Sequence, residues 1–173
     1  MKREIWDGLY ADGTKAGIDL VRGEPIPNGI YHGVCAALVK HIDGTYLLMR
    51  RDYGKDTYPG YFEATAGGSM LKGETAENGM RRELFEETGI IPRELSFLKT
   101  IVAHQKQTIY YTYLGITDCK KDAIVLQDGE TVEYRWLAYD EFAAFIRSDE
   151  CIASQVRDFG EYYASIGIDV FDT

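Results

Sequence analysis

The stretch GGSMLKGETAENGMRRELFEETGI, residues 67–90, constrains this chain more than any other. Thr75 is suited to cap the start of a helix, and Gly89 to the left-handed conformation just past its end. The last turns of that helix carry three carboxylates, on Glu83, Glu86 and Glu87. The helix dipole makes a carboxylate at this end unfavourable by about 0.3–1 kcal/mol, so a cation is needed nearby to offset the cost.

A divalent metal ion is the cation that this pattern predicts. A period of 3.6 residues puts Ala76, Met80 and Leu84 on one side of the helix, which we assign to the core. Glu83 and Glu87 lie one turn apart on a neighbouring stripe, with the third glutamate beside them. Three carboxylates that converge within a few ångströms form an oxygen-rich site suited to Mg²⁺ or Mn²⁺.

The alternative is a solvated helix face, which is the ordinary explanation of an isolated Glu-Glu pair. Features on either side of the carboxylates favour the metal site. Gly67 and Gly68 allow the backbone to turn sharply or to approach a ligand closely. Glu74 can reach back to Arg82. Gly79 lies in mid-helix, where glycine costs about 0.8–1.0 kcal/mol relative to alanine, and this indicates close packing on a sheet.

The same stretch resembles the Nudix box, G-x5-E-x7-R-E-U-x-E-E-x-G-U, in which U is apolar. Every fixed position of that motif is matched over residues 68–90, by Gly68, Glu74, Arg82, Glu83, Leu84, Glu86, Glu87, Gly89 and Ile90. The resemblance implies an α/β protein, a Nudix-type α/β/α sandwich with a mixed β-sheet. It also implies a metal-dependent hydrolase that cleaves a pyrophosphate bond in a nucleoside diphosphate linked to another moiety.

The resemblance also implies roles for residues of the box. Those matching its metal site are Glu83, Glu86 and Glu87, joined by a backbone carbonyl of Gly67 or Gly68. The carboxylate that matches Glu83 either binds the metal or acts as base, and Arg82 orients it. Glu74 matches a position of structural support. Mg²⁺ or Mn²⁺ is the cofactor that the resemblance implies.

A further acid outside the box often completes the site in this family. The segment QDGETVEYRW resembles the segment before a strand where that acid is found. Glu130 is the first candidate and Glu133 the second, although Glu130 is equally well explained as an exposed turn residue. The catalytic set implied by the resemblance is Glu83, Arg82, Glu86 and Glu130.

Basic residues precede the box in RRDYGKDTYPG. Arg50, Arg51 and Lys55 resemble a basic cluster that binds diphosphate in a Nudix subgroup similar to isopentenyl-diphosphate isomerase. Side chains alternate along a strand, so only one of Arg50 and Arg51 is expected to reach the site. Taken singly, each of these residues is also explained as surface charge. His32 matches a histidine of the same subgroup, although a lone histidine is more often structural.

Isomerase chemistry is the main alternative function. The segments YHGVC, LLMRRDYGK and YPGYF resemble the isomerases, which use a cysteine just before the box. Gly67 occupies the place of that cysteine, and Ser69 or Met70 lies near the place of a required histidine. Cys35 lies on a different strand. We therefore interpret the chain as isomerase-like in ancestry and hydrolytic in chemistry. A second alternative, a Nudix-fold binding module without catalysis, is disfavoured by the intact carboxylates.

The rest of the chain predicts one domain, residues 1–173, with a mixed sheet and flanking helices. We expect a hairpin and lead-in over residues 1–30, strands at 33–42, 45–51, 61–65, 95–104, 108–116 and 131–137, and helices in 138–173, at 139–147 and about 152–165. Tyr110, Tyr111 and Tyr113 share one strand. Core packing is the ordinary role of strand aromatics, and stacking on a base is the alternative.

Composition excludes several classes of function. A net charge of −9 argues against binding to a nucleic-acid backbone. No apolar run approaches the roughly 18 residues that span a bilayer, and the start MKREIWDGLYADG does not resemble a signal peptide. Cys35, Cys119 and Cys151 share no ligand-like spacing, as is typical of reduced thiols in a cytoplasmic protein. We expect a small-molecule diphosphate substrate. A homodimer is compatible with the family, although nothing in the sequence indicates one.

Overall fold

The computed structural model describes residues 3–170, so residues 1–2 and 171–173 of the expected end segments lie outside the described part. The chain begins with an antiparallel hairpin of β1 (Ile5–Leu9) and β2 (Lys15–Val21), which forms a sheet of its own. Gly13 has a φ of +84° in its turn. The hairpin expected within residues 1–30 is thus confirmed.

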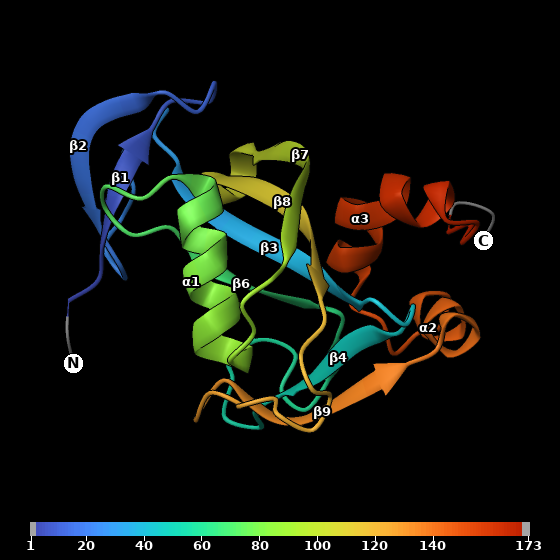
Figure 1. The fold of residues 1–173 in the computed structure, drawn as a ribbon. Helices are drawn as coiled ribbons and strands as arrows, with labels where there is room; N and C mark the ends of the chain where they lie inside the picture. The colour runs from blue at the N-terminus through green and yellow to red at the C-terminus, as the bar shows by residue number, and fades with distance from the viewer. Residues whose placement is uncertain (1–2, 171–173) are drawn as a thin grey trace.

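The second sheet is mixed, as expected. β3 (His32–His41) runs parallel to β8 (Thr108–Thr117), and β8 pairs in turn with antiparallel β7 (Glu94–Ala103). A short 3-10 turn, η1 (His104–Lys106), joins β7 to β8. In Figure 1, β3 passes through the middle of the molecule.

The other part of this sheet is formed by shorter strands. β4 (Tyr46–Arg51) pairs antiparallel with both β5 (Phe62–Glu63) and β9 (Thr131–Leu137). β6 (Thr65–Ser69) pairs antiparallel with the first half of β3. The prediction of a single strand over residues 61–65 was therefore wrong. The chain changes its partner strand at Ala64, and Gly67 and Gly68 lie inside β6.

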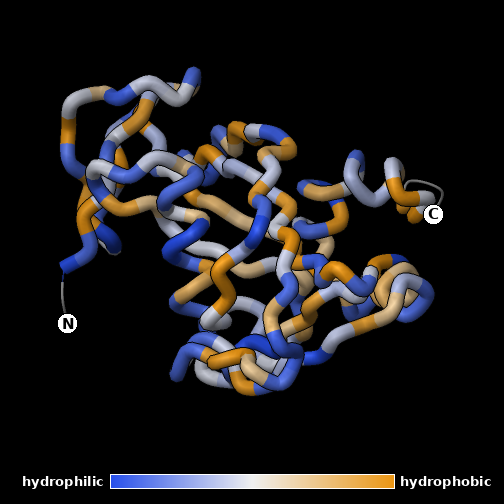
Figure 2. Tube along the Cα trace, in the orientation of Figure 1, coloured by the Kyte–Doolittle hydropathy of each residue, from blue (hydrophilic) through white to orange (hydrophobic). Residues whose placement is uncertain are grey.

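Helices cover both faces of the sheet. α1 (Ala76–Thr88) packs on one face, where Met80 and Leu84 are buried against β3 and β4. Met80 and Leu84 belong to one cluster of the hydrophobic core. α2 (Tyr139–Ile146) and α3 (Ala153–Ser165) contribute to a second cluster, which includes the stacked rings of Tyr46 and Phe142. Side chains of β3 and β4 point alternately into one cluster and into the other. The α/β/α sandwich is confirmed, and Figure 2 shows hydrophobic residues along the central strands.

The ends of α1 follow local rules of helix capping. The Thr75 hydroxyl accepts a hydrogen bond from the Asn78 N–H, and Gly89 has a φ of +72° at the other end. Both expectations are confirmed, and the last turn of α1 holds no basic residue. No helix of the described chain combines the length and apolar character that crossing a membrane requires.

Candidate active site

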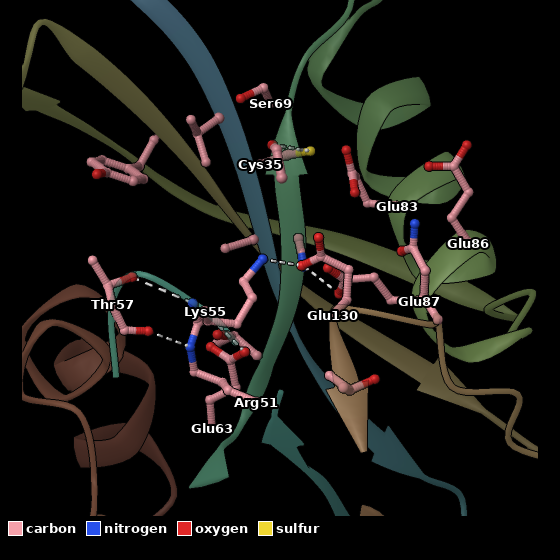
Figure 3. Close-up of a pocket in the computed structure, with 18 of the residues that line it drawn as sticks. Cys35, Arg51, Lys55, Thr57, Glu63, Ser69, Glu83, Glu86, Glu87 and Glu130 are labelled. Atoms are coloured by element: carbon pink, nitrogen blue, oxygen red, sulfur yellow. Dashed lines mark hydrogen bonds and ion pairs between the residues drawn. The ribbon is translucent and has the colours of Figure 1, made fainter. Parts of the chain in front are cut away.

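A cavity of about 830 Å³ lies where the last turns of α1 meet β6. Its walls come from distant parts of the chain: the N-terminal hairpin, strands β3 and β8, the end of β4 with the segment that follows it, β5, β6 with α1, the segment before β9, and α3. Figure 3 shows Glu83, Glu86 and Glu87 projecting from α1 on one side, with Arg51, Lys55 and Glu130 facing them. The three glutamates of the last turns of α1 and Glu130, the acid proposed outside the box, therefore line one cavity.

Arg82 connects three carboxylates of the box, those of Glu74, Glu83 and Glu86. Its Nε and Nη2 donate to the two carboxylate oxygens of Glu74 at 2.7 and 3.0 Å. Its Nη1 donates to Glu83 at 2.8 Å and to Glu86 at 3.0 Å. The planar guanidinium supplies these bonds from one rigid fork. The contact expected between Glu74 and Arg82 is confirmed, and Arg82 fixes the orientation of Glu83.

Glu87 is the buried acidic residue in the last turn of α1. Its side chain is buried and accepts a hydrogen bond from the Gly67 N–H at 3.0 Å. Burial raises the pKa of the Glu87 carboxyl well above its usual value, and the nearby charges of Glu63 and Glu83 raise it further. Among residues 3–170, no lysine, arginine or histidine forms an ion pair with Glu87. Buried carboxylates of this kind call for a cation.

The glycines of β6 make room for this arrangement. A Cβ atom at Gly67 would lie 2.1 Å from the carbonyl oxygen of Cys35 on β3. A Cβ atom at Gly68 would lie 2.6 Å from the carboxyl group of Glu83. Contacts this short do not occur for real side chains. The fold therefore requires a residue without Cβ at Gly67, where the close atoms are backbone, whereas at Gly68 a Cβ would force the Glu83 carboxyl to move. The two backbones can then pack together while Glu83 lies directly over β6.

One expectation about this cluster is not met. In the part of the chain that the structure describes, no three Asp, Glu, His or Cys side chains are grouped closely enough to hold a metal ion. Glu83 and Glu86 turn toward Arg82, whereas Glu87 turns toward Gly67, because each carboxylate takes the nearest hydrogen-bond donor. The three glutamates share the cavity without converging.

The chemistry of the donor set nevertheless fits Mg²⁺ or Mn²⁺. All its side-chain donors are oxygens, which both ions prefer. Glu87 has no cationic partner within the described chain, and the buried Thr131 hydroxyl in the same cavity has no hydrogen-bond partner there either. Both observations point to a missing ligand. The residues that could hold a metal are Glu83, Glu86 and Glu87 with a carbonyl of Gly67 or Gly68.

The two acids proposed outside the box lie in different places. Glu130 lines the cavity, and its carboxylate forms an ion pair with Lys55, which also lines it (Figure 3). Glu133 forms ion pairs with Arg50 and Arg135 and does not line the cavity. Glu130 is therefore positioned to act in the cavity, and Glu133 is not.

The three basic residues before the box do not all reach the cavity. As strand alternation predicted, only one of the two arginines does. Arg51 lines the cavity, whereas Arg50 does not. The guanidinium of Arg50 lies over the ring of Phe62 at 4.4 Å and donates to the hydroxyl of Tyr53. Assigning Arg50 to ligand binding is therefore corrected: a strand periodicity of two turns it to the opposite face of β4.

His32 and the three tyrosines have separate roles. His32 stacks on Trp6, with ring centroids 4.6 Å apart, and does not line the cavity. Tyr113 packs in the core, as ordinary strand aromatics do. Tyr110 lines the cavity, and Tyr111 lines a second cavity of about 240 Å³ beside the hairpin. A stacking surface in the main cavity is therefore limited, among these tyrosines, to Tyr110.

Several cavity residues were not identified from the sequence. They are Glu63 of β5, Gln155 and Asp158 of α3, and Arg3, Glu4 and Arg22 around the hairpin. Only Glu63 leaves a recognisable signal, as an acidic residue inside the otherwise uncharged segment YFEAT. The others reach the cavity through long-range packing, which a local pattern does not reveal.

Comparison with known proteins agrees with this geometry. The model of the NUDIX domain matches residues 31–158, so the chain belongs to the Nudix hydrolase family. An uncharacterized Nudix hydrolase of Listeria monocytogenes is 31% identical over 150 residues, covering 86% of this chain and 88% of the relative. The nucleoside triphosphatase NudI of Salmonella arizonae is 32% identical over 114 residues, 60% of this chain and 79% of the relative.

The fold is similar to that of solved structures as well. The crystal structure of DR0079 from Deinococcus radiodurans has a TM-score of 0.70, with 21% sequence identity. The alignment covers 90% of this chain and 98% of that protein. The likeness supports the α/β/α architecture and the mixed sheet.

Proposed function

We propose that this protein is a divalent-metal-dependent hydrolase that cleaves a pyrophosphate bond in a nucleoside diphosphate linked to another moiety. The observation that carries the proposal is the Glu87 carboxylate, which lines the cavity and is buried without a cationic partner in the described chain. Its neighbours Glu83 and Glu86 line the same cavity. Membership of the Nudix hydrolase family supports the proposal.

Glu83, Glu86 and Glu87, with a carbonyl of Gly67 or Gly68, would hold Mg²⁺ or Mn²⁺. When bound, such an ion neutralises charge on phosphoryl oxygens and lowers the pKa of a bound water. Arg82 keeps Glu83 oriented, because Nη1 of Arg82 donates to it at 2.8 Å. Glu83, Glu86 and Arg82 form the catalytic set together with Glu130.

Lys55 and Glu130 have different roles in the proposed reaction: Lys55 binds the diphosphate, and Glu130 accepts a proton. The ammonium of Lys55 donates to the diphosphate, and Arg51 adds positive charge on the same wall. Once Lys55 turns from Glu130 to the substrate, the Glu130 carboxylate is free to accept a proton from the attacking water. The pairing of Lys55 with Glu130 in the free protein supports this exchange.

A hydrolase is favoured over an isomerase by the surroundings of Cys35. This residue is paired with Gly68 across β3 and β6 and lines the cavity, so it is the thiol nearest the box. Burial raises the pKa of the Cys35 thiol to about 12, which keeps it protonated. Gly67 fills the place of the isomerase cysteine. We keep isomerase-like ancestry as a hypothesis about descent only.

The nature of the substrate and its setting are part of the proposal. NudI of Salmonella is named a nucleoside triphosphatase, which makes nucleoside triphosphates one class to test beside nucleotide sugars. We propose a small-molecule substrate, a cytoplasmic location and, as an option for the assembly, a homodimer.

The products formed from a panel of substrates, separated and identified by chromatography, test the function. The panel contains nucleoside triphosphates, nucleotide sugars and isopentenyl diphosphate, each assayed with Mg²⁺ and with excess chelator. Hydrolysis of a nucleotide that needs the metal supports the proposal. Isomerisation of isopentenyl diphosphate, with no nucleotide hydrolysed, would overturn it.

A further inference from the structure

A buried polar chain links α3 to the segment that carries Lys55. We name residues 52–61, which follow β4, the cavity loop. Lys55, Thr57 and Tyr58 of this loop line the cavity. The chain begins at Gln155 on α3, passes through Glu63 on β5 and ends at Arg51, where the loop begins. Glu63 and Gln155 are 92 residues apart in the sequence.

Gln155 fixes the β5–β6 junction to α3. Its side-chain oxygen accepts a hydrogen bond from the Ala64 N–H at 3.0 Å. Its side-chain nitrogen donates to the Thr65 hydroxyl at 3.0 Å and to Glu63 at 3.3 Å. The residue is 7% exposed, so losing these bonds would leave buried polar groups unpaired.

Glu63 connects Gln155 to Arg51 through hydrogen bonds to both. Its carboxylate accepts a hydrogen bond from Nη1 of Arg51 at 2.9 Å, and both side chains are largely buried. Arg51 in turn donates from Nε to the Thr57 carbonyl at 3.0 Å and from Nη2 to the Thr57 hydroxyl at 3.4 Å. All three nitrogens of the Arg51 guanidinium are therefore engaged, and two of them hold the cavity loop.

The loop needs this support. Tyr58, directly after Thr57, has a φ of +50°, which is unfavourable for a residue with a side chain. Such conformations persist where the surroundings determine them, and the two bonds from Arg51 to Thr57 do so here. Tyr58 and Lys55 lie on either side of Thr57, so the same bonds set how both face the cavity.

We infer that Glu63 and Gln155 are positioning residues, which act through Arg51 to hold Lys55 over the cavity. Neither is required to touch the reacting phosphates. The inference rests on the proposed function for its effect on substrate, but its effect on the loop does not depend on catalysis. Arg51 then has a structural role beside any contact with diphosphate.

Two variants test the inference. Gln155→Leu removes the amide at similar volume, and Glu63→Gln removes the charge that holds Arg51 without changing shape. Glu161→Gln, on the exposed side of α3, is the matched control. Hydrogen–deuterium exchange of the free protein is measured over residues 52–61. We expect faster exchange over residues 52–61 in both variants and an unchanged exchange rate in the control. Unchanged protection of the loop in a folded variant overturns the inference.

Kinetics with the best substrate of the panel provides the second readout. We expect KM to rise about tenfold in Gln155→Leu while kcat stays within about twofold, because Lys55 is misplaced but the carboxylates are not. In a Lys55→Met background, Gln155→Leu should then have no further effect on KM. Effects that simply add in the double variant overturn the inference. If no substrate is hydrolysed, the proposed function fails. The exchange experiment still decides whether Glu63 and Gln155 hold the cavity loop.

Discussion

The guanidinium of Arg82 is held by the carboxylate of Glu74 through two hydrogen bonds, of 2.7 and 3.0 Å. The same guanidinium reaches Glu83 and Glu86 with its remaining nitrogen. The supporting residue of the box and its active carboxylates are thus joined by a single side chain. Because Arg82 serves both, a change at this position should affect fold and activity together.

We predict that Arg82→Lys lowers kcat by about 10–100-fold, as removal of an orienting partner does in metal sites. A lysine has a single ammonium group and cannot reach Glu74, Glu83 and Glu86 at once. Arg81→Lys is the control, because Arg81 is more exposed and pairs only with Glu77 within the described chain. Steady-state kinetics of both variants checks the prediction, and equal activity in the two would contradict it.

Gly68→Ala should impair activity much more than stability. The new methyl group would lie 2.6 Å from the Glu83 carboxyl, which is the mobile end of a side chain and can move away. The fold then survives while Glu83 is displaced from its place over β6. Gly115→Ala is the control, since its nearest contacts would be an ordinary 3.6–3.8 Å. Thermal melting and the rate of substrate hydrolysis should separate the two effects; a large fall in melting temperature without lost activity would count against this role.

The stability of the fold should depend on pH through His32. Burial lowers the pKa of His32 below its usual value, so the unfolded chain takes up a proton at a higher pH than the folded one. The free energy of unfolding should therefore fall as pH drops below about 6.5, until the folded-state pKa is passed. Glu4 is the charged group whose influence on His32 opposes this shift.

His32→Gln should remove that part of the pH dependence. Urea unfolding of the parent and the variant, measured at about pH 7.5 and about pH 5.5, provides the comparison. The stability difference between the two proteins should shrink at the lower pH, because the neutral imidazole no longer has an advantage there. A difference that stays constant would show that His32 does not titrate differently in the two states.

Local patterns predicted the box helix well, because its signals are short in range. Thr75 and Gly89 end the helix through bonds to residues within four positions, and Met80 and Leu84 follow from periodicity alone. Likewise, the opposite directions of Arg50 and Arg51 need only the alternation of a strand. The helix ends, its buried side and the strand alternation could be predicted because none of them depends on the rest of the fold.

The features that sequence reasoning missed arise from long-range contacts. Gly67 belongs to a strand because β3 lies against it, although β3 ends at His41, well before β6 in the sequence. The link from Gln155 to Glu63 needs α3 to fold back onto β5. The spread of the three carboxylates depends on which donors the surrounding fold offers to each.

Binding of Mn²⁺ to the parent protein and to Glu87→Gln, measured by electron paramagnetic resonance, tests the central claim most directly. Glu77→Gln, on the exposed first turn of the same helix, is the control. We predict that the Glu87 variant binds Mn²⁺ at least about tenfold more weakly than the parent, with the control unchanged, because one ligand and one charge are lost. Equal affinity in the parent and in Glu87→Gln would contradict the account.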